Sequence, residues 1–259
     1  GVKKVALITG ANRGLGLETA RQLGKLGITV LMSARELAKG EAAAAELKKD
    51  GIDARAVKLD VNNPADYTAL AKQIEKDFGR LDILVNNAGV LLDSRKGNET
   101  STTSAEVLRK TLETNFFAVV GLTQALLPLL RKSEAGRIVN LSSILGSLTL
   151  HATKGSYVYD AKTFAYDTSK AALNSFTIHL ARALQRTDEI HLGDPQFVAL
   201  KHVSQGWRSR AGQYADDGQH HDLLDQAEAR LPMPWPAVPV CCHGVASCVD
   251  RTSMLWRGC

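Results

Sequence analysis

The sequence shows no apolar run that we expect to reach the length of a membrane span. The apolar stretch at residues 5–9, VALIT, is too short for the core of a signal peptide. Gly1 is followed by Val5 where a myristoylation motif requires Ser or Thr. The longest basic runs are pairs such as Lys3-Lys4, without interleaved aromatic residues. We therefore expect a cytoplasmic protein that binds neither a membrane nor a nucleic acid.

Cysteine and tryptophan are scarce and confined to one region. All 4 cysteines and all 3 tryptophans follow residue 206. The histidines and cysteines of this region lack the well-spaced C-x-x-C or H-x-x-x-H pairs that hold zinc, so we predict no metal site and expect free thiols. These residues are His220, His221, Cys241, Cys242, His243 and Cys248.

Residue usage changes along the chain near residue 190. No isoleucine follows Ile190, no lysine follows Lys201, and five of the 7 prolines lie beyond residue 190. We predict a dinucleotide-binding and catalytic domain over residues 1–190. Residues 191–259 form an atypical C-terminal segment of the same domain, which is divergent, poorly ordered or translated out of frame.

Length and charge are ordinary for a single α/β domain. The chain has 259 residues, of which 44% are hydrophobic, enough for one large core. The formal net charge of +5 is compatible with a basic cleft for an anionic cofactor.

Short apolar runs alternate with longer amphipathic ones up to about residue 190. The apolar runs are rich in Val, Ile or Leu, as is typical of parallel strands covered on both faces. This alternation predicts βαβ units and a doubly wound parallel sheet. The expected strands are 4–9, 28–33, 54–59, 81–86 and 137–141, and the expected helices are 15–26, 36–49, 64–78, 103–131 and 166–185. Residues 147–163 are predicted to be an irregular insertion.

The first expected strand leads directly into the glycine-rich stretch TGANRGLG, Thr9 to Gly16. Glycines 10, 14 and 16 fall where the strand gives way to a helix, so that the backbone can approach a pyrophosphate at the helix N-terminus. No G-K-[ST] follows, which argues against a P-loop nucleotidase. A tight turn without a ligand is the alternative.

Tyr166 precedes Lys170 by four residues within YDTSK, which places both side chains on one helix face. A positive charge beside a phenol lowers the pKa of the phenol. The spacing therefore indicates a tyrosine that exchanges its proton near neutral pH. A surface helix with an incidental tyrosine and lysine would show the same spacing.

These stretches together resemble the classical short-chain dehydrogenases/reductases. TGANRGLG is followed in order by NNAG (residues 86–89), Asn115, GRIVNLSS (136–143) and YDTSK (166–170). The resemblance covers about residues 3–186 and implies an α/β, Rossmann-like fold. The long gap between the serines and Tyr166 is similar to that in the carbonyl-reductase branch.

The resemblance implies roles for four residues. Tyr166 would be the catalytic acid, and Lys170 would lower its pKa and hold the nicotinamide ribose. Ser143 would hydrogen-bond the substrate oxygen, with Ser142 as its competitor for that role. Asn115 would hold a water that links Lys170 to solvent.

The cofactor is expected to be NADP(H). An acidic residue after the second strand would bind the adenosine 2′-hydroxyl and repel a 2′-phosphate, but the stretch LMSARE has no acid at that position. It has Arg35 there instead, and Arg13 lies in the glycine turn. Two guanidinium groups suit a 2′-phosphate, although either could be a solvated charge and Glu36 lies near. By resemblance, Asp60 would contact the adenine. The full expected cofactor set is Gly10, Asn12, Arg13, Gly14, Leu15, Gly16, Arg35, Asp60, Val61, Asn87, Ala88, Gly89, Tyr166 and Lys170.

The C-terminal part departs from the family pattern. A sixth strand at residues 198–203 followed by SQGW is the only match found, with Gln205 in place of a proline. The main interpretation is an NADPH-dependent reductase of a small-molecule carbonyl, or the reverse alcohol dehydrogenase. A non-catalytic NADP(H)-binding protein and a reductase of carrier-bound ketones are the alternatives. The insertion favours a monomer over a dimer.

Overall fold

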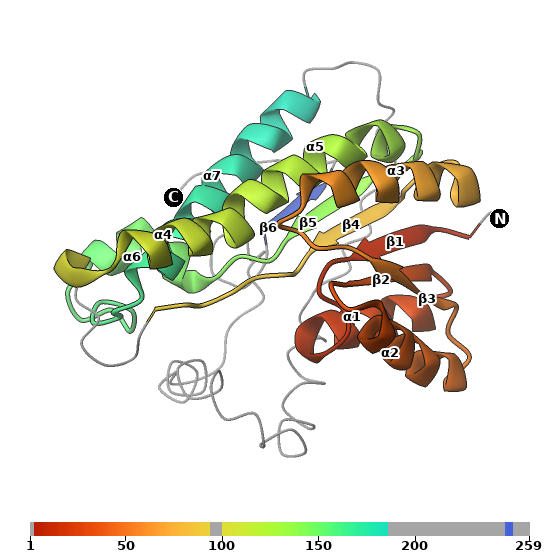
Figure 1. Cartoon of the computed structure of the whole chain (residues 1–259). Helices are drawn as coiled ribbons and strands as arrows, with labels where there is room; N and C mark the ends of the chain where they lie inside the picture. The colour runs from red at the N-terminus through yellow and green to blue at the C-terminus, as the bar shows by residue number, and fades with distance from the viewer. Residues whose placement is uncertain (1–2, 94–99, 186–246, 251–259) are drawn as a thin grey trace, which may run out of the picture.

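A sheet of six strands in the order β3-β2-β1-β4-β5-β6 forms the centre of the protein (Figure 1). The structure is a computed structural model that describes residues 3–93, 100–185 and 247–250. Five strands are parallel and match the expected ones: β1 (Val5–Ile8), β2 (Thr29–Ala34), β3 (Ala54–Lys58), β4 (Ile83–Asn86) and β5 (Arg137–Asn140). The sixth, β6 (Ser247–Asp250), pairs antiparallel with β5 and had not been expected.

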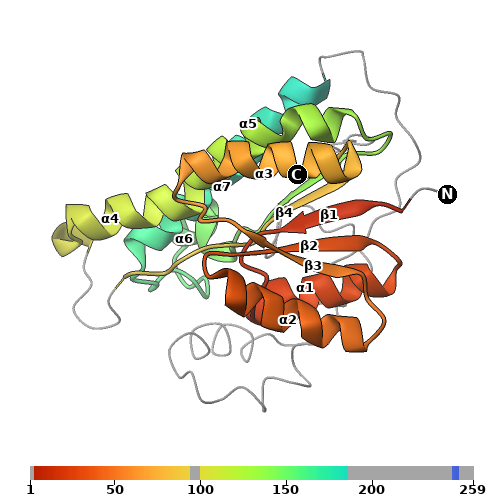
Figure 2. The ribbon, with the colours of Figure 1, turned by 45° about the vertical axis from the view of Figure 1, so that its right-hand side comes forward.

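Helices cover both faces of the sheet, as a doubly wound fold requires (Figures 1 and 2). Helices α1 (Gly14–Lys25) and α2 (Leu37–Lys49) lie on one face, where their side chains join Ile8, Val30 and Met32 in one buried cluster. Helices α3 (Pro64–Phe78), α5 (Ala118–Arg131) and α7 (Phe164–Gln185) lie on the other face. Asn63 caps α3 by accepting a hydrogen bond from Ala65 N, and Pro64 begins the helix as predicted.

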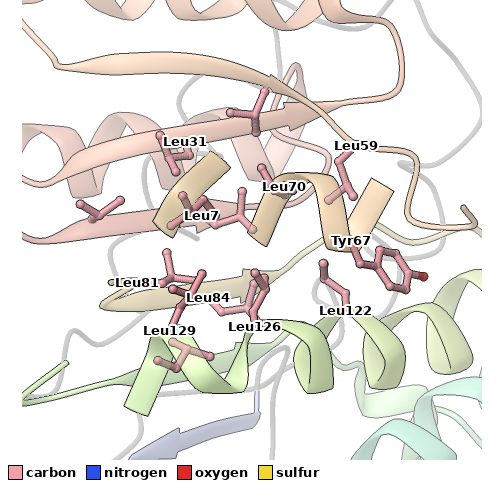
Figure 3. Close-up of a cluster of buried hydrophobic side chains, with 14 of the residues drawn as sticks. Leu7, Leu31, Leu59, Tyr67, Leu70, Leu81, Leu84, Leu122, Leu126 and Leu129 are labelled. Atoms are coloured by element: carbon pink, nitrogen blue, oxygen red, sulfur yellow. The ribbon is translucent and has the colours of Figure 1, made fainter. Parts of the chain in front are cut away.

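The second cluster is the larger core, seen between the sheet, α3 and α5 in Figure 3. Leu7 and Leu84 project from β1 and β4, and Leu70, Leu122 and Leu126 meet them from the two helices. All of these leucines are almost fully buried, so the leucine-rich face of α5 holds it on the sheet.

The expected helix over residues 103–131 is interrupted. It consists of α4 (Ala105–Leu112), a π-helical turn η2 (Glu113–Phe117) and α5, preceded by a 3₁₀ turn η1 (Thr100–Thr102). A π-turn inserts one extra residue per turn and is frequent at functional sites. Asn115 lies within it.

No run long enough to span a membrane was expected, but by length and composition alone residues Ala105–Arg131 would pass as a membrane-crossing helix, with a mean hydropathy of 1.3 over an 18-residue window. This is the only such helix within the part of the chain that the structure describes. Core helices of soluble proteins satisfy the same test, and 44% of this window is buried in the protein.

The insertion at residues 147–163 is more regular than predicted. It contains the short helix α6 (Leu148–Ala152), which follows a 3₁₀ turn η3 (Ile144–Gly146). The Ser147 hydroxyl accepts a hydrogen bond from Leu150 N and so starts α6. Together with α4, α6 lies at the end of the sheet where the parallel strands terminate (Figures 1 and 2).

Several expectations concern residues that the structure does not describe. The strand proposed at 198–203, the SQGW stretch, and the histidines and cysteines at 220–243 lie outside the described residues. Of the segment 191–259, only the backbone of β6 is described.

Candidate active site

The predicted site residues meet at the carboxyl edge of the parallel sheet. The glycine turn follows β1, Asp60 follows β3, NNAG ends and follows β4, and Ser142-Ser143 follow β5. The strands β1 and β4 are adjacent in the sheet while their following chains turn to opposite faces, so this is the point where the winding of the fold reverses. Ligands of doubly wound folds bind at such a point.

The glycine turn has the backbone that its sequence predicts. Gly10 and Gly14 have φ values of 63° and 57°, a conformation that favours glycine. Gly16 is required by space rather than by conformation. A Cβ at Gly16 would lie 2.6 Å from both the Gly10 carbonyl oxygen and Asn87 Nδ2. The turn is therefore packed tightly against the loop after β4.

Thr9 and Asn87 hold the turn in place. The Thr9 hydroxyl accepts hydrogen bonds from the backbone N–H groups of Asn87 and Ala88, both at 2.9 Å. In return, Asn87 Nδ2 donates to the carbonyl oxygens of Thr9 (2.8 Å) and Gly10 (3.3 Å). The Asn87 side chain thus supports the turn, and Thr9 is a positioning residue that the sequence interpretation missed.

The N-terminus of α1 has the features of an anion site. Its N-cap residue, Arg13, makes no side-chain capping hydrogen bond, and no acidic residue lies in the first turn. The N–H groups of this turn and the positive end of the helix dipole therefore remain available to a phosphate. Asn12 and Leu15 are partly exposed beside the turn. With the space kept open by the glycines, these residues fit a dinucleotide pyrophosphate.

Arg13 and Arg35 are both exposed. Within the described residues, neither guanidinium forms an ion pair, although Arg35 helps lower the pKa of its neighbour Glu36. The main partner of Glu36 is Lys39, whose Nζ lies 2.7 Å from Glu36 Oε1 and which is the largest cause of this lowered pKa. The carboxylate near Arg35 is thereby engaged by another cation, and both arginines are available to an anion.

The loop after β3 is ordered by its own side chains. The Asp60 carboxylate accepts a hydrogen bond from Asn62 N at 3.0 Å, and Asp60 N donates to Asp66 at 2.8 Å. The Val61 carbonyl oxygen accepts a hydrogen bond from the Tyr67 hydroxyl. Asp60 and Val61 are both partly exposed at the sheet edge, where they were expected to border the cofactor.

Tyr166 and Lys170 lie together as their spacing predicts, and Ser143 joins them as the resemblance implies. Hydrogen bonding by the Ser143 side chain acts to lower the pKa of the Tyr166 phenol. Lys170 is only 5% exposed, and its Nζ donates to the Leu141 carbonyl oxygen at 2.7 Å. The same Nζ lies 5.4 Å from the centroid of the Tyr166 ring. A Cβ placed at Gly89 would lie 3.8 Å from Lys170 Nζ, so the NNAG stretch at the end of β4 lies next to the Lys170 ammonium group.

The expected lowering of the Tyr166 pKa was wrong. Burial raises the pKa of Tyr166, the Ser143 hydrogen bond opposes that rise, and Asp167 adds to it. Lys170 is itself desolvated, and burial lowers its pKa to about 8. Because burial makes the Lys170 ammonium group costly to charge, this group does little to lower the pKa of Tyr166. The four-residue spacing indicates the charge but not the burial, so the prediction from spacing had the wrong direction.

Ser142 and Ser143 point in different directions. Ser142 is buried, and its hydroxyl donates to Asn174 Oδ1 at 2.5 Å. Ser143 is partly exposed and accepts a hydrogen bond from Leu145 N at 3.2 Å. Of the two serines, Ser143 is the one whose hydrogen bonding acts to lower the pKa of Tyr166.

Asn115 is 1% exposed and connects two segments of the site. Its Oδ1 accepts from Val90 N, and its Nδ2 donates to the Val90 carbonyl oxygen, both at 2.8 Å. Nδ2 also donates to the Ser169 hydroxyl at 3.0 Å. The π-turn thus aims this side chain between the loop after β4 and α7. Its expected water-holding role stays a prediction.

Two further titratable residues, Asp93 and Asp167, adjoin Tyr166, and a third, His151, contacts Asp167. Asp93 accepts hydrogen bonds from the N–H groups of Ala165 and Tyr166. Asp167 accepts one from the Thr163 hydroxyl at 2.7 Å, and its Oδ2 lies 3.6 Å from His151 Nε2 in α6. Burial, with Asp93 nearby, raises the pKa of Asp167 to about 6 despite these partners. No sequence motif indicated Asp93 or His151.

Among the described residues, no group of three or more His, Cys, Asp or Glu side chains is arranged to hold a metal ion.

Comparison with known proteins identifies the family of this chain. Residues 4–193 match the sequence profile of the short chain dehydrogenase family. Short-chain dehydrogenase/reductase 1 of Saponaria officinalis is 38% identical, over 70% of this chain and 77% of that protein. Carbonyl reductase [NADPH] 3 of Rattus norvegicus is 41% identical over 55% of this chain and 50% of its own length. A short chain dehydrogenase of Escherichia coli CFT073, solved in complex with NADPH, superposes with a TM-score of 0.62 at 32% identity, covering 71% of this chain and 72% of that one. The chain therefore belongs to the short-chain dehydrogenase family of oxidoreductases.

Proposed function

We propose that this protein is an NADPH-dependent reductase of small carbonyl compounds, or in reverse a dehydrogenase of the corresponding alcohols. The observation that carries the proposal is the Tyr166 phenol, which has Lys170 Nζ over its ring and a pKa that hydrogen bonding by Ser143 acts to lower, at the sheet edge that also holds the glycine turn. A proton donor and a phosphate-binding turn on one edge suit hydride addition to C=O.

The nicotinamide, when bound, supplies the hydride for reduction. Tyr166 holds the proton that the substrate oxygen must receive as negative charge develops on it. Its raised pKa keeps that proton in place at neutral pH, as suits the acid of a reduction. Ser143 would donate a hydrogen bond to the same oxygen and orient the substrate.

Lys170 would serve the site in two ways. Its Nζ lies close to Gly89 and to the Tyr166 ring, where it would reach the hydroxyls of a bound ribose. With a pKa of about 8, Lys170 is also able to change its protonation state in the range where Tyr166 must be reprotonated. Asn115 would hold the loop after β4 at the correct distance from both groups.

NADPH is preferred over NADH in this proposal because of Arg13 and Arg35. Two exposed guanidinium groups beside the ends of β1 and β2 suit a 2′-phosphate, and no acid stands there to repel it except Glu36, which Lys39 engages. The NADPH complex of the E. coli relative supports the same choice.

A melting experiment followed by a kinetic assay tests the proposal. Saturating NADPH, at a hundredfold its Kd, should stabilise the protein by about 2.7 kcal/mol, and NADH at the same concentration should give a smaller shift. NADPH oxidation is then followed with a panel of aldehydes and ketones. Tyr166→Phe should lower kcat about 10²- to 10⁴-fold and keep the NADPH-induced shift. If Tyr166→Phe turns over as fast as the wild type, Tyr166 is not the acid. If the wild-type protein binds NADPH but reduces no carbonyl compound, the non-catalytic NADP(H)-binding alternative is correct.

A further inference from the structure

We propose that Asp93 is a positioning residue, which fixes the start of α7, and with it Tyr166, against the loop that follows β4. The inference rests on the proposed function, because Asp93 would control the distance between the Tyr166 hydroxyl and a substrate bound beside the nicotinamide.

Asp93 meets α7 through two atoms of one carboxylate. Oδ1 accepts a hydrogen bond from Ala165 N and Oδ2 accepts one from Tyr166 N, both at 3.0 Å. Asp93 is 6% exposed, so these charge-assisted bonds form away from water. One of the two is made to the catalytic residue's own backbone.

A nearer residue could cap this helix but is turned elsewhere. Thr163 directly precedes α7, and threonine at that position commonly accepts hydrogen bonds from the first N–H groups of a helix. Its hydroxyl instead donates to Asp167 Oδ1 at 2.7 Å. The free N–H groups are therefore left to Asp93, which is 72 residues away in the sequence from Ala165. A remote cap fixes the helix relative to another element, which a local cap does not do.

A second connection holds the same two segments together. Asn115 binds both backbone groups of Val90 and also donates to the Ser169 hydroxyl. The Ser169 hydroxyl in turn donates to the Tyr166 carbonyl oxygen at 2.7 Å. The segment from Val90 to Asp93 is thus attached to α7 at two points, and both attachments end at Tyr166.

Asp93→Asn tests the inference with little change in shape. An amide offers one acceptor oxygen, so the second N–H of α7 would face an NH₂ group. We expect kcat to fall about 10- to 100-fold, since a shift of about 1 Å at the reacting atoms costs that much. The KM for NADPH should change little, because the glycine turn does not touch Asp93.

The single-turnover rate of NADPH oxidation, normalised to the number of NADPH-binding sites, separates positioning from stability. A residue needed only for folding would lower the number of sites and leave the rate per site unchanged. Asp93→Glu retains the charge and both oxygens but is one methylene longer, so it should recover melting temperature more than rate. If Asp93→Asn does not fold, Asp93→Glu is the variant in which the rate per site is measured. Ser104→Ala, which removes the cap of α4, is the control and should lower stability alone.

An unchanged rate per site in Asp93→Asn, or full activity in Asp93→Glu, would overturn the inference. Hydrogen exchange at the Ala165 and Tyr166 amides needs no turnover and should accelerate in Asp93→Asn. Unchanged exchange in Asp93→Asn would overturn the inference even in a protein without reductase activity. Accelerated exchange in Asp93→Asn, combined with a wild-type protein that reduces no carbonyl, would count against the proposed function alone.

Discussion

Ser142 donates a hydrogen bond to Asn174 at 2.5 Å, so the first serine after β5 is committed to α7 and the second is left for the Tyr166 hydroxyl. The two neighbours are alike in sequence and differ in direction because an extended backbone sends successive side chains to opposite sides. The scaffold role and the proposed catalytic role are therefore separable by mutation.

Ser143→Ala should lower kcat about 10- to 100-fold, because it removes a donor aimed at the developing charge on the substrate oxygen. The pKa of Tyr166 should also rise, since the Ser143 hydrogen bond lowers it. Ser142→Ala should cost about 1 kcal/mol of stability and leave kcat near the wild-type value. Steady-state kinetics and melting curves of both variants check this, and a larger loss of kcat in Ser142→Ala would reverse the assignment.

Gly16→Ala should weaken NADPH binding about tenfold or more, since overpacking costs about 1–3 kcal/mol. The new Cβ would press on the Gly10 carbonyl oxygen and on Asn87 Nδ2, both at 2.6 Å. Gly51→Ala is the matched control. Gly51 has φ 76° with open space around it, so the variant should lose about 1–2 kcal/mol of stability without any change in NADPH affinity. Calorimetric titration measures both affinities, and equal affinities would show that the turn tolerates a side chain.

Arg35→Ala should raise the Kd for NADPH about 10- to 100-fold and leave the Kd for NADH nearly unchanged, because only the 2′-phosphate loses a charge-assisted partner. Arg131→Ala, which removes an exposed cation at the end of α5, should change neither value. If the Kd values for NADPH and NADH rise by the same factor in Arg35→Ala, Arg35 does not contact the 2′-phosphate.

The titration of Asp167 should make the free energy of unfolding fall as the pH rises. Its pKa is raised from 3.8 to about 6, so the folded state holds this proton more tightly than the unfolded state. The stabilisation from this group is complete below pH 3.8 and is lost as the pH rises through about 6. Asp167→Asn should remove that loss and stabilise the protein at pH 7 by up to about 3 kcal/mol.

The same variant should lower the pKa of Tyr166, which Asp167 raises. The pH profile of alcohol oxidation should therefore shift toward lower pH. Glu106→Gln, at an exposed pair with Lys110, serves as the control and should alter neither profile. Melting curves from pH 4 to pH 9 that stay parallel for wild type and Asp167→Asn would contradict the buried-carboxyl explanation.

The parts of the fold with local signals were predictable. Short Val- and Leu-rich runs indicated the five parallel strands, and the glycine pattern indicated a turn whose Gly10 and Gly14 do have positive φ. The spacing of Tyr166 and Lys170 placed them on one face of α7, where Lys170 Nζ does lie over the phenol ring. Each of these features depends on residues a few positions apart.

Features that depend on distant partners were not predictable in this way. Asp93 has no local motif and acquires its role from Ala165, across 72 positions. The π-turn at Asn115 continues an ordinary helical pattern, and β6 lies in a segment without a strand signal. The direction of the Tyr166 pKa depended on burial, which spacing does not reveal.

The reciprocal bonds between Thr9 and Asn87 have a kinetic consequence. They are made entirely within the protein, so the glycine turn has its binding shape before any nucleotide arrives. A preformed turn loses little conformational freedom on binding. The nucleotide should therefore associate in one step at a rate set by diffusion and charge attraction, and nucleotides of different affinity should differ chiefly in how long they stay bound.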